Sequence, residues 1–242
     1  MRQRIMVAAA LMRPTVRSLP WTLLAAGWGL GLVIAAVPVL FSTEFSAAVL
    51  VNVVRVAALC GAVGMAFVLD DPARHTTGVP PVPRPLRQAL RAAVVLLVGA
   101  AWWTAVLGVV RAGTDAARWA ALPSGAVTVE AGALSGLALA LAAAVVRFSA
   151  VQVPGPAVAG TALVLPVMAG VLLPPPFALF VPLGDPRWED AHLLWSGVLA
   201  AVLAAWALCG PEPHRRVGGA RGGRPGPWRM RLTRSTRLRP GE

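Results

Sequence analysis

Six long apolar blocks, separated by short polar segments, set the pattern of the chain. They cover residues 21–41, 47–69, 92–110, 125–146, 155–173 and 191–209. A hydrocarbon core about 30 Å thick needs about 20 helical residues at about 1.5 Å each, and every block is close to that length or longer. None of the blocks shows the strict alternation that marks a membrane β-strand. The pattern predicts an all-α polytopic membrane bundle with six transmembrane helices.

The chain divides into three regions by composition. Residues 1–20 place Arg2, Arg13 and Arg17 on one side of a helical wheel, which predicts a basic amphipathic N-terminal helix lying on the inner membrane surface. The alternative is a frayed basic leader that only fixes the topology. Residues 21–209 form the predicted six-helix domain. Residues 210–242 are rich in Arg, Gly and Pro, and we expect a disordered cytoplasmic tail.

The distribution of arginine predicts the orientation. All 22 basic residues are arginine, and only Arg111, Arg118 and Arg187 fall in the loops opposite the two termini. Eighteen others lie at the N-terminus, after the second and fourth blocks, and in the tail. By the positive-inside rule both termini are cytoplasmic. The excess of Arg, Ala, Gly and Pro suggests a GC-rich bacterial coding sequence, and together these features predict a multi-pass protein of the bacterial plasma membrane. The net charge of +12 gathers at the inner face, so it favours anionic lipid headgroups over nucleic acid.

Two charged residues interrupt the apolar blocks. Arg55 lies about 13 Å below the outer end of the second block and Glu130 about 8 Å below the outer end of the fourth, depths that an arginine side chain can bridge. Because a lone charge in hydrocarbon costs at least about 2.5 kcal/mol, we predict an Arg55–Glu130 ion pair. Asn52, three residues before Arg55, is predicted to share its inward face. The pair either fixes helix packing or, with Asn52, lines a substrate path.

The inner end of the second block carries a compact charged turn. Asp71 followed by Pro72 is typical of an N-cap and first helical position, which predicts a short helix at residues 72–77. Together with Asp70 and Arg74 it is the most ordered-looking element facing the cytoplasm, although an ordinary polar connector has the same pattern.

The loop after the fifth block is unusually apolar for an outer loop. Phe177, Leu179, Phe180, Val181 and Leu183 lie between prolines, which predicts a hairpin that turns back toward the bilayer.

Catalytic and cofactor chemistry are not expected in this chain. It has no lysine, which a P-loop requires, so any ATP hydrolysis must come from another polypeptide. Ser135 and His192, with Asn52 as an oxyanion donor, resemble the dyad of intramembrane proteases, but the G-x-S-G pattern fails because Ser135 follows Gly132 by three places. The three histidines lie in separate segments, so no metal site and no cofactor is predicted.

Three stretches carry a family resemblance. The segments AFVLDDPARHTT (66–77), LPSGAVTVEA (122–131) and DPRWEDAH (185–192) resemble small six-helix permease subunits of ABC transporters from GC-rich Gram-positive bacteria. The broader resemblance is to ABC-2-type exporters, which have an amphipathic N-terminal helix, a coupling helix after the second span and a re-entrant hairpin before the last span.

That resemblance implies a permease subunit of an exporter, driven by a separate ABC ATPase and working as a homodimer or with a second permease. It implies further that Asp70, Asp71, Pro72 and Arg74 contact the ATPase. The competing hypothesis is a secondary transporter or a non-transport membrane scaffold.

Overall fold

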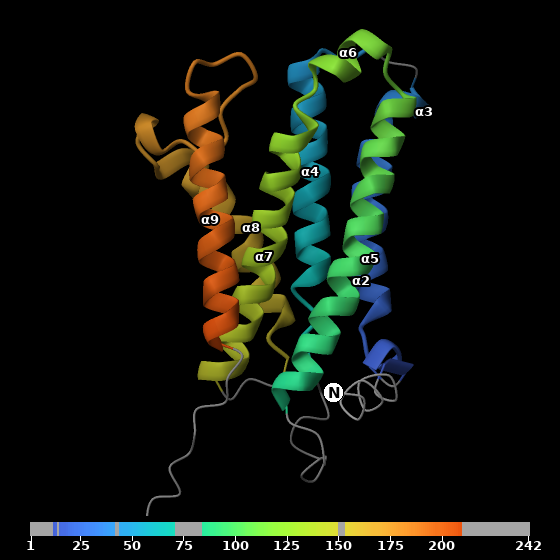
Figure 1. The fold of residues 1–242 in the computed structure, drawn as a ribbon. Helices are drawn as coiled ribbons and strands as arrows, with labels where there is room; N and C mark the ends of the chain where they lie inside the picture. The colour runs from blue at the N-terminus through green and yellow to red at the C-terminus, as the bar shows by residue number, and fades with distance from the viewer. Residues whose placement is uncertain (1–11, 14, 42–43, 71–83, 150–152, 210–242) are drawn as a thin grey trace, which may run out of the picture. The chain divides into compact units, whose positions relative to one another are not determined.

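The computed structural model describes residues 12–13, 15–41, 44–70, 84–149 and 153–209. The elements in these ranges are α2 (Trp21–Ala35), α3 (Val37–Leu40), α4 (Ala47–Met65), α5 (Arg84–Ala112), α6 (Ala116–Ala121), α7 (Ser124–Phe148), α8 (Gly155–Leu172), the 3-10 turn η1 (Pro175–Phe177) and α9 (Trp188–Cys209). All of them belong to one compact unit, Met1–Glu212, shown in Figure 1. The second unit, Pro213–Glu242, lies outside the described residues, as do most of the predicted N-terminal helix and the predicted tail.

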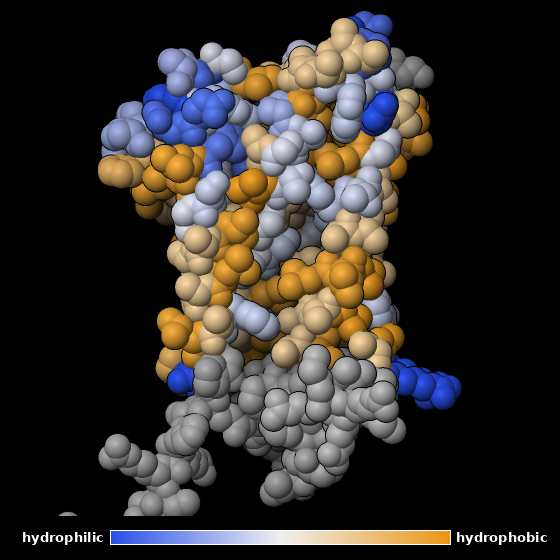
Figure 2. Space-filling view, in the orientation of Figure 1, coloured by the Kyte–Doolittle hydropathy of each residue, from blue (hydrophilic) through white to orange (hydrophobic). Residues whose placement is uncertain are grey.

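By length and composition, five of the described helices can cross a membrane: α4, α5, α7, α8 and α9. Apolar residues cover most of the face seen in Figure 2, and hydrophilic residues gather at its upper end. The described part of the chain is therefore an all-helical, multi-pass membrane bundle, as the apolar blocks predicted.

The first apolar block is broken rather than continuous. It forms the 15-residue α2 and, after Ala36, the four-residue α3, which has Pro38 in its first turn. Proline removes a backbone donor and clashes with the preceding turn, which accounts for the break. At about 1.5 Å per residue α2 spans only about 22 Å, so a sixth span needs α2 and α3 together and stays a prediction.

Helix α4 lies at the centre of the bundle. It contacts α2 and α5 on one side and α7 and α8 on the other, and α9 packs on α7 (Figure 1). Its amino end is capped by Ser46, whose hydroxyl accepts a hydrogen bond from the Val49 amide. This central position makes α4 the element through which the two sides of the bundle meet.

Small residues allow α2 to approach α4 and α5 closely. A Cβ atom on Gly27 would lie 2.7 Å from the carbonyl oxygen of Cys60, and one on Gly31 would lie 2.7 Å from the Trp102 ring. The Trp102 indole stacks on Trp28 with ring centroids 5.8 Å apart and donates a hydrogen bond to the Trp28 carbonyl. The G-x-x-x-G spacing at Gly27 and Gly31 is thus used for packing within the chain.

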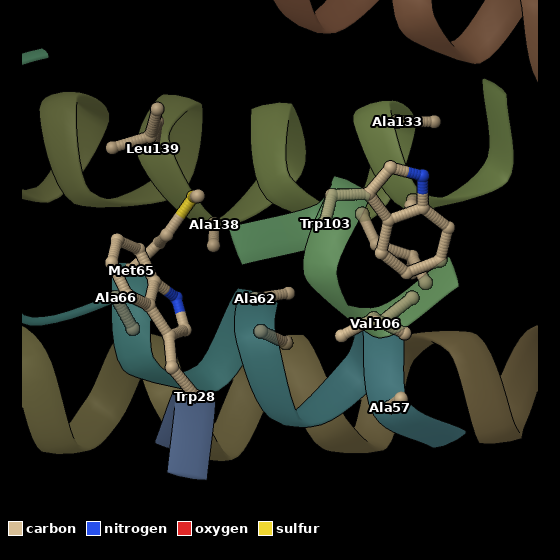
Figure 3. Packing of buried hydrophobic residues seen from close by; sticks show 14 of the residues in the cluster. Trp28, Ala57, Ala62, Met65, Ala66, Trp103, Val106, Ala133, Ala138 and Leu139 are labelled. Atoms are coloured by element: carbon tan, nitrogen blue, oxygen red, sulfur yellow. The ribbon is translucent and has the colours of Figure 1, made fainter. Parts of the chain in front are cut away.

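The core continues between α4, α5 and α7. Figure 3 shows Trp28 beside Met65 on one side and Trp103 beside Val106 on the other, with alanines of α4 and α7 between them. The Trp103 indole donates a hydrogen bond to the Thr128 hydroxyl, so its polar atom is satisfied within the apolar core.

The second G-x-x-x-G motif packs α7 against α9. A Cβ atom on Gly136 would lie 2.8 Å from Val202, and one on Gly132 would lie 3.8 Å from Leu199. This close contact fixes α9 against α7 and so brings the amino-terminal part of α9 near the charged residue of α7.

Following the predicted orientation, we call the end of the helices that carries α6 the outer end. Helix α6, which the sequence did not reveal, is capped by Asp115 through a 2.8 Å hydrogen bond from the Arg118 amide. Residues 174–187, between α8 and α9, also lie at this end and are called the outer hairpin.

Candidate functional site

The charged residues inside the bundle meet at one place. Arg55 of α4, Glu130 of α7 and His192 of α9 form what we call the Arg55 cluster. The side chain of Arg55 is 8% exposed, that of Glu130 1% and that of His192 11%. Three ionisable groups are therefore removed from water within one site.

Arg55 and Glu130 form a two-pronged ion pair. Nε of Arg55 donates to one carboxylate oxygen of Glu130 at 2.7 Å, and Nη2 donates to the other oxygen, also at 2.7 Å. This fork-to-fork geometry is the strongest form of such a pair and fixes the relative orientation of the two side chains. The structure thus brings together the two residues that the sequence paired by depth.

Arg55 also joins the outer hairpin to the bundle. Its Nη1 donates to the carbonyl oxygen of Val181 at 3.1 Å. The guanidinium lies 5.6 Å from the ring centre of Phe180 and 5.5 Å from that of Trp188. Cation–π contacts of this kind are worth more when they are desolvated, as here. One side chain of α4 therefore connects α7, the hairpin and the start of α9.

His192 closes the cluster from α9. Its Nε2 lies 2.9 Å from a carboxylate oxygen of Glu130, and its Nδ1 lies 2.8 Å from the carbonyl oxygen of Trp188. The imidazole and indole rings of His192 and Trp188 are 4.3 Å apart. Both ring nitrogens of His192 thus face oxygen atoms of Trp188 and Glu130, and neither faces Ser135.

The outer hairpin turns back onto the bundle, and its apolar residues pack against the core. Val181 is 2% exposed, and Leu179, Phe180 and Leu183 lie against the core. The Trp195 indole of α9 donates to the Leu179 carbonyl at 2.7 Å, and the Trp195 ring meets Phe180 edge-on. This arrangement accounts for the apolar residues that the sequence placed in an outer loop.

A local ion pair shapes the end of the hairpin. The Arg187 guanidinium and backbone amide both donate to Asp185, which lowers the pKa of that carboxyl to about 2. A depressed acid pKa means that the pair contributes its stability above the ordinary value of 3.8 and loses it as the pH falls through about 2. Gly184, with a backbone φ of 91°, makes the turn that precedes the pair.

The inner end of α4 is tied to α8. The Asp70 carboxylate accepts a 2.8 Å hydrogen bond from the Gly155 amide at the start of α8. Burial raises the pKa of Asp70, and the hydrogen bond from Gly155 opposes that shift. Asp70 is therefore half-buried and engaged within the chain. The other candidates for the coupling site, Asp71, Pro72 and Arg74, and the helix predicted at residues 72–77, lie outside the described residues.

The placement predicted for Asn52 is wrong. Asn52 is exposed on the outside of α4, whereas Arg55 is buried. Positions three apart on a helix differ by about 60° around its axis, and the buried stripe of α4 ends between them. Asn52 does not belong to the Arg55 cluster.

His192 is the member of the cluster that sequence reasoning missed as a partner. The hydrophobic pattern drew attention to charges within the blocks, and His192 stands at the edge of the last block. The available signal was its spacing from Trp188, because positions four apart on a helix lie on one face and a cation such as Arg55 favours an aromatic face.

Comparison with models of protein families, with curated proteins and with solved structures gives no match for this chain.

Proposed function

We propose that this chain is the membrane (permease) subunit of an ABC-type exporter in the bacterial plasma membrane, driven by a separate cytoplasmic ATPase. One structural observation carries the proposal: α4 is tied to other helices at both ends. Asp70, five residues beyond the end of α4, joins the segment that follows the helix to α8, and Arg55 joins the outer part of α4 to α7 and the outer hairpin.

This arrangement suits a helix that transmits movement. About 15 Å of continuous helix separates Arg55 from Met65. The segment that follows Asp70 in the chain, residues 71–83, connects α4 to α5. Force applied there by a partner protein would therefore act on α4 and α8 together and reach the Arg55 cluster through α4.

The surface of the bundle is compatible with a second subunit or with lipid. Valines on α8 (Val164, Val167, Val171) and leucines on α9 (Leu193, Leu203) are exposed. In a membrane such side chains face acyl chains or another helix. A homodimer or a pair with a second permease is part of the proposal, and the exposed Arg13 and Arg17 are suited to anionic headgroups at the inner face.

Purification of the tagged full-length chain from its native membranes tests the proposal. We expect an ABC ATPase to co-purify in stoichiometric amount, and its ATP hydrolysis to rise when both are reconstituted in proteoliposomes. A chain that purifies as a stable bundle without any ATPase refutes the proposal.

Charge reversal then locates the coupling site. The double variant Asp71→Arg, Arg74→Glu leaves the Asp70–Gly155 bond intact, so it should abolish stimulation of the ATPase without loss of folded protein. Asp70→Asn tests the charge of the remaining acidic candidate separately, because asparagine still accepts from the Gly155 amide. If stimulation survives the double reversal, the ATPase contacts another part of the chain.

A secondary transporter is the second candidate, and the Arg55 cluster favours it. Ionisable groups within membrane helices often mark a proton or ion path. Reconstituted alone, such a transporter would move its substrate in response to a pH gradient and without ATP, which the exporter proposed above would not do.

A further inference from the structure

The hydrogen bonds of His192 require more protons than a neutral imidazole carries. Nδ1 faces the Trp188 carbonyl, which only accepts hydrogen bonds, and Nε2 faces a carboxylate oxygen of Glu130. A neutral ring has one N–H, so it satisfies one of these contacts and places a lone pair against oxygen in the other. Both contacts are made at 2.8–2.9 Å. One additional proton satisfies both.

We propose that Glu130 and His192 form a proton-binding site, whose bound proton holds the outer hairpin and α9 against α4 and α7. The proton lies between Nε2 of His192 and the Glu130 oxygen, and in either position it makes that contact a hydrogen bond. With Arg55 and the proton in place the cluster carries one net positive charge.

The surrounding charges do not supply another partner for the site. Arg55 of α4 is already bonded to both oxygens of Glu130. On the hairpin, Asp185 and Arg187 are paired with each other. In the first turn of α9, Glu189 and Asp190 are exposed, and α8 has no ionisable residue.

The cluster is positioned to exchange this proton with the outer side. His192 is its most exposed member and stands in the second turn of α9, close to the outer end. Glu130 and Arg55 lie deeper and are better shielded. The proton therefore enters and leaves through His192.

Loss of the proton weakens the contact between α9 and α7. Nε2 of His192 and the Glu130 oxygen would then repel each other across 2.9 Å. Since a ligand stabilises the state that binds it, the proton favours the closed hairpin at low pH, and closure is lost as the pH rises. The hairpin is affected because the Arg55 side chain that bonds Val181 also bonds Glu130.

Thiol labelling measures this opening. Val181→Cys places a thiol at a buried position and keeps the backbone carbonyl that Arg55 bonds, in a full-length chain whose native cysteines are replaced by alanine. Phe177→Cys, at a position 54% exposed on the same hairpin, corrects for the pH dependence of thiol chemistry itself. Labelling at Val181→Cys, relative to Phe177→Cys, should rise on the order of tenfold from pH 5 to pH 8, a factor that one charge-assisted hydrogen bond commonly supplies.

His192→Gln is the decisive variant. Its amide N–H can donate to Glu130 at any pH, so the labelling ratio should become independent of pH. His75→Gln and His214→Gln are matched controls and should behave as the parent does. A flat ratio in the parent chain, or an unchanged rise in His192→Gln, overturns the proposal.

A second measurement does not depend on any variant folding well. The chain has three histidines, so nitrogen-15 spectra of the labelled parent protein can resolve their rings. At pH 5 the Nε2 of His192 should show a bond to a proton shared with Glu130. A neutral His192 beside an ionised Glu130 at pH 5 contradicts the proposal. Neither experiment uses ATP, substrate or a partner, so each outcome is independent of the proposed transport function.

Discussion

Removal of Glu130 should destabilise the bundle more than removal of Arg55. In Glu130→Leu the buried guanidinium keeps one hydrogen bond, to the Val181 carbonyl, and two aromatic faces. An uncompensated buried charge of this kind costs about 3–5 kcal/mol. In Arg55→Leu the Glu130 carboxylate keeps His192 as a partner. The free energy of unfolding should therefore fall only by about the value of a hydrogen bond to a charged group, about 1.5–3 kcal/mol.

The double variant Arg55→Leu, Glu130→Leu should cost less than Glu130→Leu alone, because it leaves no lone charge behind. A double-mutant cycle isolates the coupling, and contacts of this kind give about 0.5–3 kcal/mol. The free energy of unfolding can be measured by titrating detergent-solubilised full-length chain with a denaturing detergent and following tryptophan fluorescence.

The exposed pair Glu44–Arg118 at the outer end provides a matched control. Its 2.8 Å contact is nearly as short as the buried one at 2.7 Å, but the Glu44 side chain is 78% exposed. Water competes with such an exposed contact, so the coupling energy between Glu44 and Arg118 should be no larger than the experimental error. Additive losses would show that Arg55 and Glu130 act independently. A larger loss for Arg55→Leu than for Glu130→Leu would refute the assignment of His192 as the second partner of Glu130.

Three other predictions concern packing, the inner end of α4 and topology. Gly27→Ala should destabilise the fold by about 1–3 kcal/mol, because its Cβ would meet α4 backbone, while Gly29→Ala, with nothing within 4 Å, should be neutral or slightly stabilising in the same unfolding assay. Asp70→Ala should cost about 1 kcal/mol through loss of the α8 cap, whereas Asp70→Asn keeps the acceptor. Burial raises the pKa of Asp70, so the folded chain favours the protonated carboxyl more than the unfolded chain does. The free energy of unfolding should therefore fall as the pH rises from the unfolded pKa through the folded pKa of Asp70. Asp70→Asn should remove this dependence. Reporter fusions after Arg118 and after Pro211 should fall on opposite sides of the membrane, and finding both on one side would show that the predicted orientation is wrong.

Burial depth could be predicted from the sequence because charge is rare in apolar blocks. Arg55 and Glu130 stood out for that reason, and the difference between their depths was within the reach of an arginine side chain. The direction each side chain faces could not be predicted in the same way. In a membrane helix the outward face is as apolar as the inward face, so α4 has no polar stripe to show which side is buried, and Asn52 was placed wrongly.

The break in the first block had a visible signal. Pro38 cannot donate a backbone hydrogen bond and disturbs the turn before it, and α2 ends three residues earlier, at Ala35. Counting apolar residues alone overlooked this, because proline does not interrupt a hydropathy average. No sequence pattern indicates that the Val181 carbonyl contacts Arg55, since every residue has a carbonyl and only the folded hairpin brings this one to Arg55.

The two sides of α4 are held by different forces, and this difference bears on function. On the α2 side, glycines and tryptophans pack at contact distance, so a change in side-chain volume disturbs that interface. On the α7 side, near the outer end, the contacts are ionic and shared with α9 and the hairpin. A purely structural contact there could have been made by apolar side chains at no desolvation cost, since buried ion pairs seldom add net stability. A contact that depends on charge can instead be altered by a proton or by a shift of α4 too small to disturb the glycine packing. Under the proposed function, the Arg55 cluster is therefore the place where movement of α4 and the pH on the outer side would act on the same bonds.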